Sequence, residues 1–278
     1  KTAYEISLGL VGSEMCIRDR VRRPCIVGKG ITFDTGGISI KPTSGMWDMK
    51  YDMCGAATVF GLMEALYETG YSRRVNGISC LAENMPGSGA YRPGDVFKTY
   101  SGKTVEVFST DAEGRNVLSD GLWKAGELDP EYIIDLATLT GAVIVALGNQ
   151  ISGMWSNDDD LARNLKSAAE RSGEPVWRMP LNNQFRKYMT DSAFADIRNG
   201  SIGGRAGSSN TAAAFLEFFV PNRGFDEDSE KIPWAHLDIA GSAWGPGSKA
   251  RSEGENPLFQ FGTSGIHVRT LHRMITES

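Results

Sequence analysis

Residues 107–120 read Val-Phe-Ser-Thr-Asp-Ala-Glu-Gly-Arg-Asn-Val-Leu-Ser-Asp, and they place several charges where one regular pattern ends and another begins. The alternating residues 104–108 before the charges are typical of a strand, and the apolar spacing over 117–123 after them is typical of a helix. Asp111 and Glu113 have a simple structural interpretation, because acidic residues in the first turn of a helix offset the positive end of its dipole. The pair alone therefore does not establish a functional site.

Two observations favour a functional site over helix capping. Gly114 and Arg115 interrupt the capping pattern, and a second acidic cluster follows another predicted strand. That strand is the apolar run 25–27, which opens into a glycine-rich loop over 28–37 containing Asp34. In open α/β sheets ligands bind beyond the carboxyl ends of the strands, so the two clusters are expected to converge on one site.

The rest of the chain alternates predicted strands with predicted helices. The strands are expected at residues 78–81, 132–136 and 234–239, and the helices at residues 53–63, 113–127, 137–147, 161–169, 182–189, 211–220 and 266–275. The acidic run 158–160 is expected to form a solvated first turn of a helix, not a metal cluster. This order predicts the α/β class, with a mostly parallel sheet sandwiched between helices in a single catalytic domain.

Composition limits the possible functions. The 278 residues are 41% hydrophobic and carry a net charge of −5, which argues against a nucleic-acid partner or an anionic membrane surface. No apolar run approaches the ~20 residues that a membrane span needs. The 4 cysteines form no Cys-x-x-Cys pair, which favours a reducing, cytoplasmic location. With only 3 histidines, a metal site here must consist mainly of carboxylates.

The candidate ligands are the four carboxylates Asp34, Asp52, Asp111 and Glu113. Lys29 stands in the same glycine-rich loop as Asp34, where a lysine is ordinarily a surface charge. Four carboxylates brought together repel one another, so such a site needs cations. Oxygen-rich sites suit Mg²⁺, Mn²⁺ and Zn²⁺, and shared carboxylates can hold two ions ~3.5–4 Å apart for hydrolysis or for phosphoryl transfer. The composition of the cluster leaves both reactions open.

Two long motifs resemble the catalytic domain of the leucyl (cytosol) aminopeptidases, a family of two-metal hexameric exopeptidases. They are Ser-Thr-Asp-Ala-Glu-Gly-Arg at residues 109–115 and Val-Gly-Lys-Gly-Ile-Thr-Phe-Asp-Thr-Gly-Gly-Ile-Ser-Ile-Lys at residues 27–41. The similarity continues through residues 135–142 and 234–241. It implies peptide substrates with a free α-amino group, a leucine-like preference and two divalent ions, zinc or manganese.

The resemblance also assigns roles to individual residues. The tighter metal site would consist of Lys29, Asp34, Asp52 and Glu113, and the looser one of Asp34, Asp111 and Glu113. Lys29 would bind only as a neutral amine, so burial and adjacent cations must lower its pKa.

Outside the ligand set, Lys41 would polarise the scissile carbonyl, and Arg115 would hold a bicarbonate ion that acts as general base. The substrate's side chain would enter a pocket formed by Met49, Thr138, Ala240 and Ala243. Ordinary core packing is an alternative for these pocket residues, above all for the two alanines.

Residues 1–20 read differently from the rest and are expected to be a non-native or disordered leader, with the catalytic domain over 21–278. The resemblance implies that the family's N-terminal domain and first catalytic-domain strands are absent, and that an intact member is a homo-hexamer. Ser109 stands where the family usually has Asn, and Asn116 where it usually has Leu. An inactive fragment or scaffold subunit is therefore the alternative to an enzyme, and a DNA-binding role has no support from the acidic charge.

Overall fold

A six-stranded sheet forms the centre of the computed structural model, which describes residues 23–201, 204, 206–245 and 262–277. The strand order is β2-β1-β5-β9-β6-β7. The strands are β1 (Cys25–Asp34), β2 (Asn76–Asn84), β5 (Ile133–Ala137), β6 (Ser152–Ser156), β7 (Val176–Arg178) and β9 (Trp234–Asp238). Only the β6–β9 pair is antiparallel within this sheet, so the prediction of a mostly parallel sheet is confirmed. The expected leader over 1–20 lies outside the described residues.

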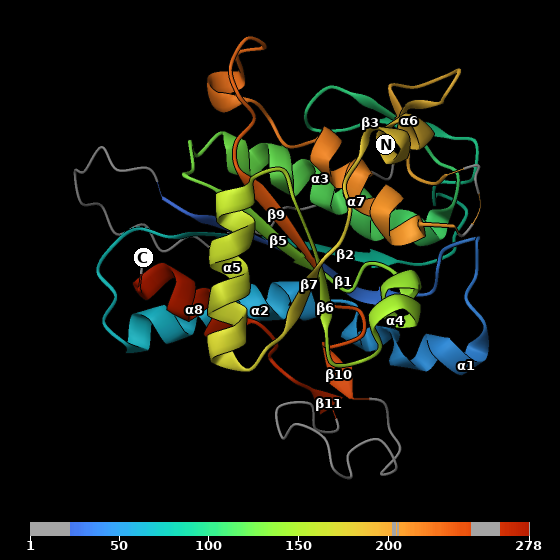
Figure 1. Cartoon of the computed structure of the whole chain (residues 1–278). Helices are drawn as coiled ribbons and strands as arrows, with labels where there is room; N and C mark the ends of the chain where they lie inside the picture. Colours follow the sequence, from blue (N-terminus) through green and yellow to red (C-terminus); the bar gives the residue numbers. More distant parts are fainter. Residues whose placement is uncertain (1–22, 202–203, 205, 246–261, 278) are drawn as a thin grey trace.

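Helices cover both faces of this sheet (Figure 1), as the α/β prediction requires. On one face lie α3 (Glu113–Gly126) and α7 (Ser208–Phe218), and on the other lie α2 (Cys54–Glu68), α5 (Asp159–Ser172) and α8 (Val268–Thr276). The shorter elements are α1 (Thr43–Met46), η1 (Trp47–Tyr51), β3 (Val96–Lys98), β4 (Thr104–Glu106), η2 (Thr110–Ala112), α4 (Gly141–Leu147), α6 (Asn183–Thr190), β8 (Ile197–Arg198), η3 (Arg223–Phe225), β10 (Trp244–Gly245) and β11 (Gly262–Thr263). Among the described residues, no helix combines the length and the apolar character needed to cross a bilayer.

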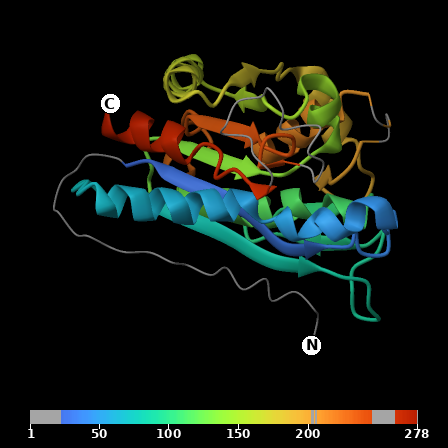
Figure 2. The same cartoon turned by 90° about the horizontal axis from the view of Figure 1, so that it is seen from below.

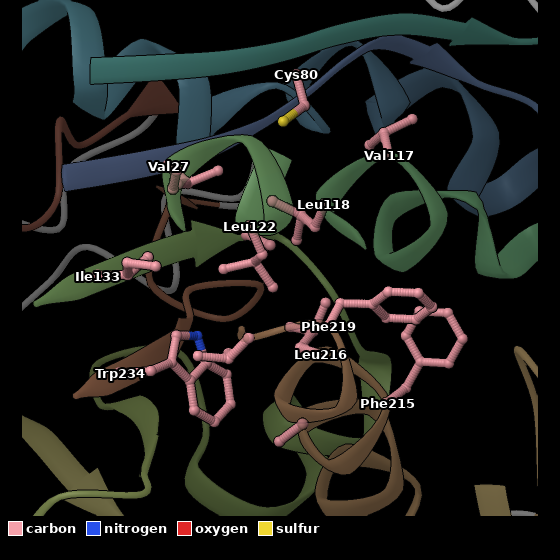
Figure 3. Packing of buried hydrophobic residues seen from close by; sticks show 14 of the residues in the cluster. Val27, Cys80, Val117, Leu118, Leu122, Ile133, Phe215, Leu216, Phe219 and Trp234 are labelled. Atoms are coloured by element: carbon pink, nitrogen blue, oxygen red, sulfur yellow. The ribbon is translucent and has the colours of Figure 1, made fainter. Parts of the chain in front are cut away.

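A large apolar cluster fixes α3 to the sheet. Leu118 and Leu122 of α3 meet Phe215 and Phe219 at α7 and Trp234 of β9, and Figure 3 shows these side chains gathered between the helices and the strands. All five are fully buried. Burying a side chain of this size contributes about 1.5–3 kcal/mol relative to leaving it exposed. The cluster therefore anchors the helix whose first residue is Glu113.

On the opposite face, α2 lies unusually close to β1. A Cβ atom at Gly55 of α2 would stand 2.1 Å from the carbonyl oxygen of Leu136 and 2.8 Å from the amide nitrogen of Lys29. A Cβ atom at Gly28 of β1 would in turn stand 2.5 Å from the backbone of Gly55. Glycines on both elements thus allow the helix and the strand to touch through their backbones, and Figure 2 shows α2 lying along β1.

Two strand predictions were wrong. Residues 28–34 do not form a loop but continue β1, because Gly28 is paired on both sides, to β2 and to β5, and its missing side chain serves the approach of α2. The predicted strand 104–108 ends at Glu106 and lies outside the main sheet. It pairs with β3 and β8 in a separate three-stranded sheet.

The acidic run at the start of α5 behaves as predicted. Asp158 is the residue before the first turn, and its side chain accepts a hydrogen bond of 2.7 Å from the backbone amide of Leu161. Asp159 and Asp160 occupy the first turn, where both are exposed. Capping therefore accounts for this cluster.

Candidate metal centre

A register shift turns Asp34 towards the same side of the sheet as Lys29. Lys29 lies between Val27 and Ile31, whose side chains pack in the cluster with α3. Simple alternation along β1 would direct residue 34 to the opposite face. The pairing of β1 with β2 shifts between Ile31 and Asp34, so that Asp34 stands opposite Asn84. One extra residue in β1 thus brings both charged side chains to one face.

The loop after β1 is tied to the acidic motif that precedes α3. The Thr110 hydroxyl donates to the Gly36 carbonyl at 2.6 Å and accepts from the Ser39 amide at 2.9 Å. Ser109 caps η2 by accepting a hydrogen bond from the Asp111 amide at 3.2 Å. The two acidic clusters therefore converge, although the motif arrives from the small sheet and not from the main one.

All five predicted ligands gather in one cluster, in which four are buried and Asp111 is exposed. One carboxylate oxygen each of Asp34, Asp111 and Glu113 lie within 4.8 Å of one another, an arrangement that can hold a metal ion. Lys29 Nζ lies 2.8 Å from Asp52 Oδ2 and 2.9 Å from Glu113 Oε1. Asp52 is not part of the three-carboxylate group and joins the cluster through Lys29.

Two neighbouring side chains complete the cluster. Lys41 Nζ lies 2.8 Å from Asp34 Oδ2 and also contacts Asp111 Oδ1. The Thr138 hydroxyl donates to Asp52 Oδ1 at 2.8 Å, and the Thr138 carbonyl accepts from Lys29 at 3.1 Å. Thr138 therefore supports Asp52 and Lys29 directly, in addition to any contact with a substrate.

The cluster holds excess negative charge. Its four carboxylates face only two ammonium groups, those of Lys29 and Lys41. Burial raises the pKa of Asp52, and Glu113 and Asp34 raise it further against the opposing effect of Lys29. Burial would lower the pKa of Lys29, but its three carboxylate neighbours outweigh burial and raise it. A set of oxygen donors that is buried except at Asp111 and carries uncompensated negative charge fits divalent cations.

Arg115 points its guanidinium towards the same region. Nη1 donates to the Asn199 carbonyl at 2.8 Å, whereas the buried Nε has no hydrogen-bond partner within the described residues. Burial lowers the pKa of Arg115 to about 10, and Glu113 and Asp238 act in the opposite direction. The side chain therefore keeps its positive charge at neutral pH, with one N–H free to bind an anion.

Sequence reasoning missed the residue that holds both ends of the acidic motif. Asn199 is fully buried, and its Oδ1 accepts from the amides of Phe108 at 2.8 Å and Ser109 at 3.2 Å. Its Nδ2 donates to the Ser109 carbonyl at 2.9 Å, while its own carbonyl accepts from Arg115. In the sequence, Asn199 begins the Gly- and Ser-rich stretch 199–209. Nothing in that stretch indicates a contact with Ser109, which lies 90 residues earlier.

Asn199→Ala is expected to lower the free energy of unfolding by about 3 kcal/mol, because it removes three part-buried hydrogen bonds and leaves the amides of Phe108 and Ser109 without this acceptor. Denaturant unfolding followed by circular dichroism measures this change. Asn164→Ala on the exposed side of α5 is the matched control, expected to stay within about 0.5 kcal/mol of the parent. Equal stability of the two variants would contradict the view that the hydrogen bonds of Asn199 hold the acidic motif in place.

A second missed residue, Asp238, joins the loops that carry two predicted pocket residues. Its carboxylate accepts hydrogen bonds from the Leu139 amide at 3.1 Å, the Thr140 hydroxyl at 2.6 Å and the Ala240 amide at 3.2 Å. These bonds fix the loop after β5, which contains Thr138, against the end of β9. Asp238 lies within the stretch 234–241, but no local pattern marks it as a link between loops.

The four predicted pocket residues do not share one environment. Met49 lies partly buried in η1, and Ala243 is 1% exposed in the apolar cluster with α2, α5 and α8. Ala240 belongs to the cluster on the α3 face. Their role in substrate binding stays a prediction.

A cavity lined by described residues adjoins the acidic cluster. It measures about 340 Å³ and is lined by Asn84, Tyr91, Phe97, Glu113 and Asn116, among others. A larger cavity of about 420 Å³ lies near the amino ends of β1 and β5, and no predicted site residue lines it. The smaller cavity is therefore the one relevant to the chemistry.

Comparison with known proteins agrees with these motifs. Residues 15–272 match the profile of the cytosol aminopeptidase family, catalytic domain. A relative described as "Probable cytosol aminopeptidase", from Hamiltonella defensa subsp. Acyrthosiphon pisum (strain 5AT), is 52% identical over 229 residues. That alignment covers 82% of this chain and 43% of the relative, so the chain spans less than half the length of the protein it matches. By the extent of the family match, the chain belongs to the cytosol aminopeptidase family.

Proposed function

We propose that this chain is the catalytic part of a two-metal aminopeptidase that removes the N-terminal residue, with a leucine-like preference, from peptides with a free α-amino group. The observation that carries the proposal is the convergence of Asp34, Asp111 and Glu113 within 4.8 Å, beside two buried or half-buried lysines. The family match supports a peptidase over a phosphatase or nuclease built from similar carboxylates.

The donor set divides into two groups that share carboxylates. Lys29, Asp34, Asp52 and Glu113 would hold one zinc or manganese ion, and Asp34, Asp111 and Glu113 the other. Bound divalent ions would supply Lewis-acid polarisation of the scissile carbonyl and acidify a water molecule. Lys29 can act as a ligand only after it loses its proton, which positive charge among the same carboxylates favours.

Lys41 and Arg115 are proposed to act on the substrate and on a bound anion. Lys41 Nζ stands beside Asp34 and Asp111, where an ammonium group can polarise the carbonyl and stabilise the negative charge that develops on its oxygen. The planar guanidinium of Arg115 suits a trigonal anion such as bicarbonate, and its unpartnered Nε supports that assignment. Bicarbonate held there would accept a proton from the attacking water.

The proposal extends to the setting of the enzyme. The resemblance implies a cytoplasmic homo-hexamer for the intact family member, and the family match supports peptides as its partners. The net charge of −5 argues against a nucleic-acid partner. The alternative is an inactive fragment or scaffold subunit of the same family.

The test compares leucine anilide with its N-acetylated form, in the presence of Zn²⁺ or Mn²⁺. We expect release of leucine from the free amine to exceed cleavage of the blocked form by about a hundredfold or more, because a site built to bind an amine rejects a substrate that lacks it. Equal cleavage of both forms would overturn the amino-group mechanism. A cooperative melt that Zn²⁺ or Mn²⁺ shifts upwards, without any hydrolysis, would instead support the scaffold alternative.

A further inference from the structure

Asn84 ends β2 at the point where the two acidic clusters meet. Its side-chain Nδ2 donates to Asp34 Oδ1 at 2.8 Å and to the Thr110 carbonyl at 2.9 Å, and it lies 3.4 Å from Glu113 Oε2. Three acceptors surround the nitrogen, so the amide has one chemically sensible orientation: an oxygen at this position would face three other oxygens. Asn84 is 4% exposed and is therefore shielded from competing water.

These contacts divide the oxygens of two carboxylates in the same way. Asp34 Oδ1 accepts from Asn84 and from the Gly36 amide at 2.8 Å, while Oδ2 faces Lys41 Nζ at 2.8 Å. Glu113 Oε2 faces Asn84, while Oε1 faces Lys29 Nζ at 2.9 Å. In both residues one carboxylate oxygen faces the neutral side-chain amide of Asn84, and the other faces the ammonium group of a lysine.

We propose that Asn84 is a positioning residue, which holds one oxygen of Asp34 and one of Glu113 so that the other oxygen of each stays directed at bound cations. The inference rests on the proposed function, because it concerns the two carboxylates that both ions would share. An amide suits this position. A carboxylate would repel both neighbours, and a lysine or arginine would add a positive charge that competes with the cations.

The main chain at Asn84 is fixed independently of its side chain. Its carbonyl accepts hydrogen bonds from the Thr35 amide at 3.0 Å and from the Thr35 hydroxyl at 2.8 Å. Asn84 also stands opposite Asp34 in the β1–β2 pairing. A substitution that shortens the side chain therefore leaves the end of β2 in place and removes the donors to the two carboxylates, together with the hydrogen bond to the Thr110 carbonyl.

The test measures the affinity for Zn²⁺ or Mn²⁺ by competition with a chelator, in the parent chain and in Asn84→Ala. We expect the variant to bind about 10- to 100-fold more weakly, since loss of a partner that orients a ligand has an effect of this size. We also expect kcat/KM to fall at limiting metal and to recover in part at saturating Mn²⁺. Asn84→Ser, whose side chain is too short to reach both carboxylates, should show the same loss and replaces Asn84→Ala if that variant does not fold.

Asn116→Ala is the matched control, because Asn116 lines the same cavity and its Oδ1 accepts no hydrogen bond within the described residues. Its cation affinity is expected to stay within about threefold of the parent. The inference would be overturned if the Asn84 variants had a lower melting temperature in the presence of chelator but bound cations as tightly as the parent. Asn84 would then have only a structural role. A parent chain that binds neither cation would contradict the proposed function instead.

Discussion

Glu113→Gln is expected to lower kcat/KM for a free-amine peptide substrate by about a thousandfold or more, a loss of about 4 kcal/mol of transition-state stabilisation. Glutamine has nearly the shape of glutamate but carries no charge and offers one oxygen where glutamate offers two. Glu113 Oε1 faces Lys29 and Oε2 faces Asn84, so both oxygens are in use. The substitution therefore weakens both proposed cation positions at once.

The measurement combines steady-state kinetics with the number of metal ions bound per chain. Glu127→Gln is the matched control, because Glu127 is exposed just beyond the other end of α3 and contacts only groups remote from the acidic cluster, such as Lys124. We expect this control to keep parental kinetics and metal content. Glu113→Gln with two bound ions and more than a tenth of parental activity would remove the shared-ligand role of Glu113.

Gly55→Ala is expected to lower the free energy of unfolding by about 3 kcal/mol, at the upper end of the range for overpacked cores. The added Cβ would stand 2.1 Å from the Leu136 carbonyl oxygen and 2.8 Å from the Lys29 amide nitrogen. Both neighbours are backbone atoms of central strands, so neither can move as the end of a flexible side chain does. Displacement of β1 would also move Lys29, and we expect weaker cation binding in the same variant.

Chemical denaturation of Gly55→Ala and of Gly45→Ala measures the effect. Gly45 lies in α1, and a Cβ atom there meets nothing within 4 Å. The control variant should therefore match the parent or be slightly more stable, because alanine is the better helix former. A loss below about 1 kcal/mol in Gly55→Ala would show that α2 can move away from β1 at little cost.

Much of the fold could be predicted because apolar periodicity reports which segments are buried. The parallel strands β1, β2, β5 and β9 and the helices between them follow directly from that pattern. The extent of β1 could not be predicted, because Gly28 and Gly30 signal a loop when read alone. Their purpose depends on α2 and on neighbouring strands, which are remote in sequence. Periodicity also cannot say which sheet a strand joins, so the place of β4 was missed.

The candidate site, too, could be predicted only in part. Its charged residues stand in two long motifs, and their convergence was predicted correctly. The rule for the carboxyl ends of strands refers to one sheet, however, whereas β4 lies in a different sheet from β1. Asn84, Asn199 and Asp238 act through hydrogen bonds to partners far away in the chain. A lone Asn or Asp has many local explanations in a turn or cap, so the sequence gives no reason to select these three.

The hydrogen bonds between Asn199 and the start of the acidic motif have a consequence for synthesis on the ribosome. The motif's entry at Ser109 is held by a residue 90 positions later, and β4 pairs with β8 at Val105 and Ile197. At about 5–20 residues per second, roughly 5 to 20 seconds of elongation separate the emergence of the two partners. Such distant contacts also form slowly in a released chain. The nascent polypeptide therefore carries its acidic motif without these hydrogen bonds while the next 90 residues are added, and the centre is completed only after that.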